Sequence, residues 1–159
     1  QLEREDFDLS SLARDVAGRL KASAKKNGVV ITVIGDKAEI NGVKSIVDEM
    51  VFNLVDNAVK YTPRGSHICL EASARDDRVL ISVTDDGNGI SDEAKEKIFD
   101  MFYTGNKASS DARRGLGLGL ALCKSIVQAH GGSIEVSDNT PHGAVFTFDL
   151  KRAEVQPDE

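Results

Sequence analysis

Two asparagines and a lysine recur at helical spacing in the segment "GVKSIVDEMVFNLVDNAVKYTPRG", residues 42–65. On a helix, Asn53, Asn57 and Lys60 share one face with Glu49, because they are three or four residues apart. A solvated polar face is the simplest interpretation, but asparagine is a poor helix former and two in register are unfavourable. Amide oxygens beside a lysine suit a hard cation and a phosphate chain. The row therefore predicts a site for a metal ion and a phosphate group.

A second candidate is the stretch "VTDDGNGIS", residues 83–91, in which a β-branched segment ends at Asp85. Asp and Gly dominate tight turns, so a plain turn is one interpretation. A carboxylate at a strand end could also accept hydrogen bonds from the amino group of a base. Gly87 and Gly89 would then let a planar ring lie against the backbone.

A third candidate is "GLGLGL", residues 115–120, which precedes a helical pattern. A strand edge or low-complexity filler would give the same letters, but glycine weakens both helices and strands. At the start of a helix, the glycines Gly115, Gly117 and Gly119 would leave backbone N–H groups free to bind a phosphate.

The elements that must position these residues alternate irregularly between helix and strand. Pro63 and Gly65 end the long helix, and a polar segment without periodicity, residues 103–114, predicts a loop. The pattern favours an α/β fold, a two-layer sandwich of one mixed sheet with helices packed on one face. The other expected elements are a helix from about Leu9 to Gly28 with Ser10 or Ser11 as N-cap, a strand over 29–35, strands on either side of Asp76 and Asp77, a short helix after Ser91, a helix over 117–130 and a hairpin over 133–150.

The whole chain has 159 residues and a formal net charge of −6, without a basic stripe. This charge argues against a nucleic-acid partner. Cys69 and Cys123 are far apart, which predicts no disulfide and a reducing compartment. No apolar run approaches the length of a membrane span, so we expect a cytoplasmic location and no direct membrane insertion of this fragment, although its parent could be anchored. The charged start without a Met suggests an excised piece.

Together these motifs resemble the ATP-binding catalytic domain of sensor histidine kinases, within the wider group of gyrase, Hsp90 and MutL. "NLVDNAVKYT" resembles the asparagine box, "DDGNGI" the first glycine box, "IFDMFY" the phenylalanine box, and "GLGLGLALCKSIVQAHGG" the second glycine box with its helix. "PHGAVFTF" resembles the last glycine box, and "RRGLGLGLALCKSI" resembles the KdpD-like group. The resemblance implies a Bergerat-type fold over residues 7–150, a remnant of an upstream helical linker over 1–6 and a disordered tail over 151–159.

The resemblance also implies roles for individual residues. Asn57 would be the principal Mg²⁺ ligand, assisted by Asn53, and Lys60 would reach the phosphates of ATP. Asp85 would bond the adenine amino group. Other expected nucleotide contacts are Tyr61, Gly87, Gly89, Ile90 and Tyr103.

In the second glycine box the resemblance implies phosphate contacts through backbone N–H groups, at Gly115, Leu116, Gly117, Leu118 and Gly119. Leu116 occupies a position where Thr or Ser is common. Residues 103–114 would form a mobile lid. Thr104 replaces an arginine that many members carry, so Lys107, Arg113 or Arg114 would supply that phosphate contact.

The family's phosphoacceptor histidine lies on a helical hairpin that precedes this domain. None of His67, His130 and His142 has that setting, and His130 is expected to be structural, as a cation at a helix C-terminus. The resemblance implies a domain that binds Mg-ATP and donates the γ-phosphoryl group to a histidine on the separate hairpin, with a response regulator receiver domain as a further partner. The general base would belong to the hairpin, and Glu49 is a weaker candidate.

Two alternatives remain open. One is a stand-alone anti-sigma-factor serine kinase of the same fold, and the other is a non-enzymatic nucleotide-binding module. "NLVDNAVKYT" and the "HGG" after the last helix favour the histidine kinase, and the intact asparagine and glycine boxes argue against a degenerate module.

Overall fold

A computed structural model describes residues 3–100 and 117–153 of the chain. The described helices are α1 (Leu9–Arg19), α2 (Lys21–Asn27), α3 (Lys44–Tyr61), α4 (Asp92–Lys97) and α5 (Gly117–Ala129). The described strands are β1 (Glu5–Asp8), β2 (Val30–Gly35), β3 (Glu39–Gly42), β4 (His67–Arg75), β5 (Arg78–Asp85), β6 (Ser133–Asp138) and β7 (Ala144–Lys151).

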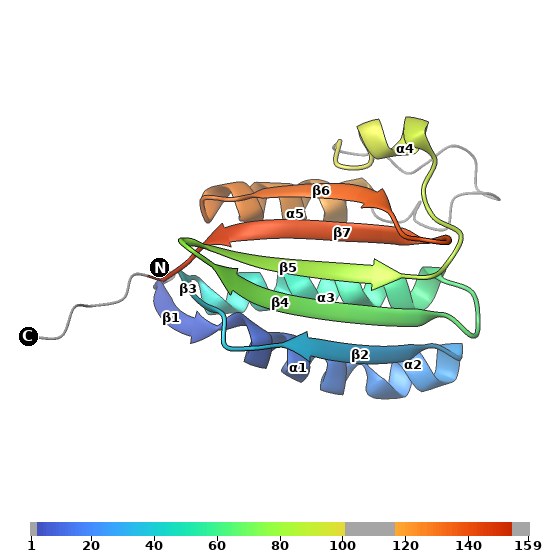
Figure 1. Cartoon of the computed structure of the whole chain (residues 1–159), viewed down its shortest axis with the longest axis horizontal. Helices are drawn as coiled ribbons and strands as arrows, with labels where there is room; N and C mark the ends of the chain where they lie inside the picture. Colours follow the sequence, from blue (N-terminus) through green and yellow to red (C-terminus); the bar gives the residue numbers. More distant parts are fainter. Residues whose placement is uncertain (1–2, 101–116, 154–159) are drawn as a thin grey trace, which may run out of the picture.

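Five strands form one mixed sheet in the order β2-β4-β5-β7-β6. The pair β2–β4 is parallel and the other three pairs are antiparallel. Helices α1, α3 and α5 lie against one face of this sheet (Figure 1). The predicted two-layer α/β sandwich is confirmed. In the part of the chain that the structure describes, no helix is long and apolar enough to cross a membrane.

The core lies between the sheet and the helices, and strict alternation along the central strands builds it. On β5 the buried side chains are Val79, Ile81 and Val83, and on β7 Phe146 and Phe148 occupy the equivalent row. Successive side chains of a strand point to opposite faces, so every second residue faces the helices. Helix α3 completes the core with the buried apolar residues Val47, Met50, Leu54 and Ala58.

The first helical segment differs from the prediction in two respects. The helix is interrupted at Leu20, which separates α1 from α2. Leu20 departs from the helical conformation (φ −97°, ψ 0°), and its side chain is almost wholly buried. Gly18, a poor helix former, lies just before the break. The N-cap is Asp8, whose carboxylate accepts from the backbone N–H of Ser10, and not Ser10 or Ser11. The expected end at Gly28 is confirmed, with a left-handed φ of 71°.

The two ends of the described chain meet at a small sheet that the sequence analysis missed. Strand β1 pairs with β3, with Glu5 opposite Gly42. The predicted helical linker through residue 6 is therefore not helical at Glu5. At the other end, Arg152 bridges to Ile40 and the backbone N–H of Ala153 bonds to the oxygen of Glu39, so the expected disordered tail does not begin at 151.

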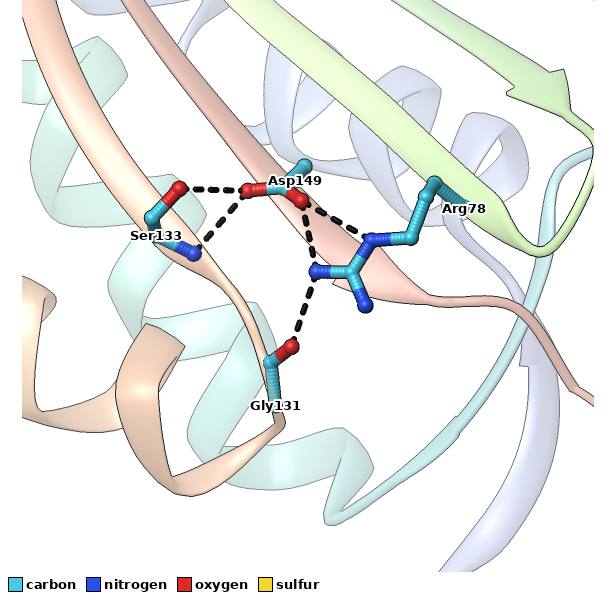
Figure 2. A network of polar contacts seen from close by, with 4 residues as sticks. All are labelled: Arg78, Gly131, Ser133 and Asp149. Atoms are coloured by element: carbon cyan, nitrogen blue, oxygen red, sulfur yellow. Dashed lines mark hydrogen bonds and ion pairs between the residues drawn. The ribbon is translucent and has the colours of Figure 1, made fainter.

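A polar cluster fixes the C-terminal end of α5 to the sheet. We call the residues Arg78, Gly131, Ser133 and Asp149 the Asp149 cluster (Figure 2). The guanidinium of Arg78 donates to Asp149 Oδ2 and to the backbone oxygen of Gly131, while Ser133 donates to Asp149 Oδ1 through its backbone N–H and its hydroxyl. Strands β5, β6 and β7 are thereby joined to the turn that follows α5.

Candidate functional site

The polar row on α3 shows a gradient of burial. Glu49 is exposed, Asn53 is half-buried and Asn57 is only 3% exposed. Among the described residues, Oδ1 of Asn57 has no hydrogen-bond partner. An unpaired buried acceptor costs about 1–3 kcal/mol, and a bound ion is one of the arrangements that would offset this cost. The interpretation of the row as a merely solvated face is wrong for Asn57.

The chemistry of this oxygen fits the ion that the sequence predicts. A neutral amide oxygen is a ligand that Mg²⁺ accepts, and the half-buried amide of Asn53 lies one helical turn earlier on the same face. The described residues contain no cluster of three or more His, Cys, Asp or Glu side chains that could hold a metal. Mg²⁺ usually keeps several waters and takes few protein ligands, so a site built on one or two side chains is compatible with this ion.

Lys60, the last residue of the row, is exposed and pairs with Asp56. The distance from Lys60 Nζ to Asp56 Oδ2 is 2.9 Å. The hydrogen bond that the ammonium donates to this carboxylate raises the pKa of Lys60, so the ammonium stays charged. A phosphate contact at Lys60 would compete with Asp56 for the same ammonium group. Tyr61, at the end of α3, is half-buried.

Asp85 occupies the last inward-facing position of β5, in the same row as the buried valines. Its exposed fraction is only 2%. Oδ1 of the carboxylate accepts the backbone N–H of Gly87 at 3.0 Å and that of Ala144 at 3.3 Å. Backbone donors thus hold a buried acceptor on the helix-facing side of the sheet, as the sequence predicts for a residue that meets the amino group of a base.

The turn between β6 and β7 contacts the segment over 85–90, which we call the base loop because it carries the predicted adenine contacts. Sequence reasoning missed this role of the turn. The side chain of Asn139 donates to the backbone oxygen of Asp85 at 2.9 Å, and His142 Nδ1 lies 2.9 Å from the oxygen of Gly87. A Cβ on Gly143 would lie 2.0 Å from the oxygen of Asp85, so only glycine permits this approach. The weak resemblance of "PHGAVFTF" to a glycine box was the available signal.

Both glycines of the first glycine box lie in restricted positions. A Cβ on Gly87 would come within 3.1 Å of the Thr62 methyl group and 3.2 Å of Asp85 Oδ1. Gly89 has a left-handed φ of 79°. Ile90 is half-buried and packs against the core. Thr62 was absent from the predicted site residues, although it directly follows the helix that carries Asn57.

The phosphate end of the predicted site is only partly described. Gly117, Leu118 and Gly119 form the first turn of α5, which confirms the predicted helix start. The other predicted residues of this region lie outside the described residues: Tyr103, Lys107, Arg113, Arg114, Gly115, Leu116 and the proposed lid over 103–114.

The three histidines occupy structural positions that differ from one another. His67 is exposed beside Asp86 at the start of β4, and His142 contacts the base loop. His130 Nε2 accepts the backbone N–H of Val43 at 3.1 Å while Nδ1 faces the oxygen of Ile126 at 2.8 Å. These two backbone contacts join the end of α5 to the start of α3, and they support the expectation of a structural His130.

Comparison with known proteins places these features in context. Residues 42–154 match the family described as histidine kinase-, DNA gyrase B- and HSP90-like ATPases. The chain is 39% identical over 128 residues to the sensor protein KdpD of Clostridium acetobutylicum, which covers 80% of this chain but only 14% of KdpD.

Solved structures agree in fold. The catalytic domain of histidine kinase ThkA superimposes with a TM-score of 0.82 at 28% identity, covering 95% of this chain and 97% of that domain. Full-length ShkA in complex with AMPPNP gives a TM-score of 0.82 at 29% identity, covering 99% of this chain and 33% of ShkA. ThkA has also been solved with the response regulator protein TrrA, with a TM-score of 0.76 at 26% identity and coverage of 96% of this chain and 42% of that one.

Proposed function

Because the chain belongs to the family of histidine kinase-, DNA gyrase B- and HSP90-like ATPases, we propose that it is the ATP-binding catalytic domain of a sensor histidine kinase. The chain spans 14% of the length of KdpD. The histidine that receives the phosphoryl group would then lie on a separate helical hairpin. The main support for this proposal is the buried Oδ1 of Asn57, which has no hydrogen-bond partner among the described residues. A bound ion would offset the free-energy cost of burying this oxygen unpaired.

In this proposal, the described residues bind the nucleotide at two ends of the site, one for the base and one for the phosphates. At the base end, the Asp85 carboxylate would accept the adenine amino group, and Gly87, Gly89 and Ile90 would flank the ring. At the phosphate end, Asn57 and Asn53 would hold Mg²⁺, and the first turn of α5 would present its N–H groups to the phosphates. Bound Mg²⁺ supplies charge neutralisation on the phosphates during phosphoryl transfer.

We further propose the remaining contacts from the resemblance. Lys60, Tyr61, Tyr103, Gly115 and Leu116 would complete the nucleotide site, and Lys107, Arg113 or Arg114 would contact the γ-phosphate. A response regulator receiver domain would be the downstream partner, as ThkA is found with TrrA. Because ATP and receiver domains occur in the cytoplasm, the domain would act there.

Calorimetric titration with ATP, with and without Mg²⁺, tests this function. We expect Mg²⁺ to tighten ATP binding, and Asn57→Ala to weaken Mg-ATP binding at least about tenfold through loss of a metal ligand. Asn27→Ala at the end of α2 is the matched control and should bind like the parent protein. ATP binding that is unaffected both by Mg²⁺ and by Asn57→Ala would refute the metal site.

A further inference from the structure

The backbone of Asp85 lies where the pairing of β5 with β7 stops. The last pair of this ladder joins Thr84 to Val145, so Asp85 would face Ala144 if the pairing continued. The N–H of Ala144 instead donates to Oδ1 of the Asp85 carboxylate, at 3.3 Å. The backbone oxygen of Asp85 therefore needs another donor, because Asp85 is only 2% exposed and a buried backbone carbonyl rarely stays unpaired.

Asn139 supplies this donor from the turn between β6 and β7. Its side-chain Nδ2 donates to the backbone oxygen of Asp85 at 2.9 Å. The orientation of the amide follows from its other contact, because Oδ1 of the same side chain accepts the backbone N–H of Thr140 at 2.9 Å. The backbone N–H of Asn139 donates to the oxygen of Gly143 at 3.0 Å, which closes the turn around this contact.

The two acceptors of Asp85 that face β7, its backbone oxygen and its carboxylate, depend on each other through their donors. If Asn139 did not donate to the backbone oxygen, the N–H of Ala144 would be well placed to replace it, because this group already faces Asp85 from β7. The carboxylate would then lose one of the backbone donors that hold it. Asn139 thus influences the carboxylate without contacting it, because it leaves the Ala144 N–H available to the carboxylate.

We propose that Asn139 is a positioning residue for recognition of the adenine base. Its bond to the backbone of Asp85 keeps the Ala144 N–H on the carboxylate, and the carboxylate is thereby held where it accepts from the exocyclic amino group. This inference rests on the proposed function, because it requires ATP to bind with its base at Asp85. It assigns to the β6–β7 turn a part in nucleotide affinity that acts through Asp85.

Two variants of Asn139 separate its bond to Asp85 from its bond within the turn. Asn139→Ala removes both bonds, whereas Asn139→Asp removes the donor but keeps an oxygen that can accept the N–H of Thr140. Thr140→Ala is the matched control, because the side chain of Thr140 is exposed and its backbone N–H remains. His142 still contacts Gly87 in all three variants, so we expect the fold to persist, and thermal unfolding checks this.

The measurement is the dissociation constant of two nucleotides, by calorimetric titration of the parent protein and the three variants. One nucleotide is Mg-ATP, and the other is the Mg²⁺ complex of purine riboside triphosphate, which carries a hydrogen in place of the amino group. We expect Asn139→Ala and Asn139→Asp each to lower the preference for ATP over this analogue by about three- to tenfold, the effect of one hydrogen bond of ordinary strength. Thr140→Ala should retain the preference of the parent protein.

The outcomes distinguish a positioning role from plain support of the turn. Equal weakening of both nucleotides, or an unchanged preference, in the two Asn139 variants would show that Asn139 only stabilises the turn. A preference that falls in Asn139→Ala but not in Asn139→Asp would assign the effect to the bond with Thr140 and overturn the proposal, as would a parent protein that binds both nucleotides equally. Failure of the parent protein to bind Mg-ATP would overturn the proposed function itself, on which the inference rests.

Discussion

Asp85 shows how a single side chain links the fold to the chemistry. It continues the row of inward-facing valines on β5, where an apolar residue would extend the core. The backbone N–H groups of Gly87 and Ala144 donate to its carboxylate, which is thereby held as a buried acceptor in an otherwise apolar row. A buried carboxylate in a fixed position favours a ligand that carries a hydrogen-bond donor.

Asp85→Asn should weaken ATP binding at least about tenfold, because one charge-assisted hydrogen bond contributes about 1.5–3 kcal/mol. The fold should persist, since the amide oxygen can still accept from Gly87 and Ala144. Calorimetric titration with Mg-ATP measures the effect, and thermal unfolding checks the fold. Asp86→Asn, at the neighbouring half-exposed carboxylate that bonds to the backbone of His67, is the control and should leave ATP affinity nearly unchanged. Equal affinities for Asp85→Asn and the parent protein would remove Asp85 from the site.

At this scale the sequence identified residues that lie within short motifs. Asn57 and Asp85 were proposed as site residues because their spacing and neighbours carry the signal locally, and the structure shows that both are buried. Asn139 was not, because it meets Asp85 across 54 positions of sequence, and only the pairing of β7 with β5 brings the two together. The proximity of Thr62 to Gly87 was not predictable for a similar reason, since it is a tertiary contact.

Among the elements, α5 is held at its C-terminal end by the Asp149 cluster (Figure 2). Burial alone would raise the pKa of Asp149, but the hydrogen bonds from Ser133 and Arg78 outweigh it and hold the pKa below the ordinary value of 3.8. A lowered folded pKa means that the carboxylate stabilises the fold above the unfolded pKa. That stabilisation disappears as the pH falls through the folded pKa.

Asp149→Asn should therefore lower the free energy of unfolding by about 1–2 kcal/mol near neutral pH, because it weakens the bonds to Arg78 and Ser133. The difference from the parent protein should shrink below about pH 4, where the parent carboxylate is protonated. Urea unfolding between neutral and acidic pH provides the measurement, with Glu135→Gln on the exposed face of β6 as the control. A difference that is constant with pH would contradict the assigned ionisation of Asp149.

The long or strongly alternating elements and the short helix after Ser91 were predicted well, whereas the strands β1 and β3 were not. Helix α3 and strands β4, β5 and β7 carry clear periodicities of 3.6 and 2 residues. Strands β1 and β3 have four residues each and are mostly polar, so their pairing depends on tertiary contacts that no local pattern records. The break at Leu20 was missed because the apolar spacing continues across it.

The whole molecule is a two-layer sandwich that gathers residues from α3, the end of β5 and the β6–β7 turn at one end of the central strands. All three histidines are described, and each is engaged elsewhere: His67 next to Asp86, His130 with the backbone of Val43, and His142 with Gly87. None lies within a helix, where the resemblance places the acceptor. A domain of this kind would bind ATP without modifying itself, and it would require the histidine hairpin of its parent.

The most direct test of this account is the transfer of label from γ-labelled ATP, with and without the parent's histidine hairpin added in trans. We predict no label on the isolated domain and acid-labile label on the hairpin. The transfer should be slow, because the effective concentration that a covalent tether provides is missing. Asn57→Ala should abolish the transfer, whereas Asn27→Ala should not. Stable labelling of the isolated domain at His67, His130 or His142, or acid-stable label on a serine, would contradict the account.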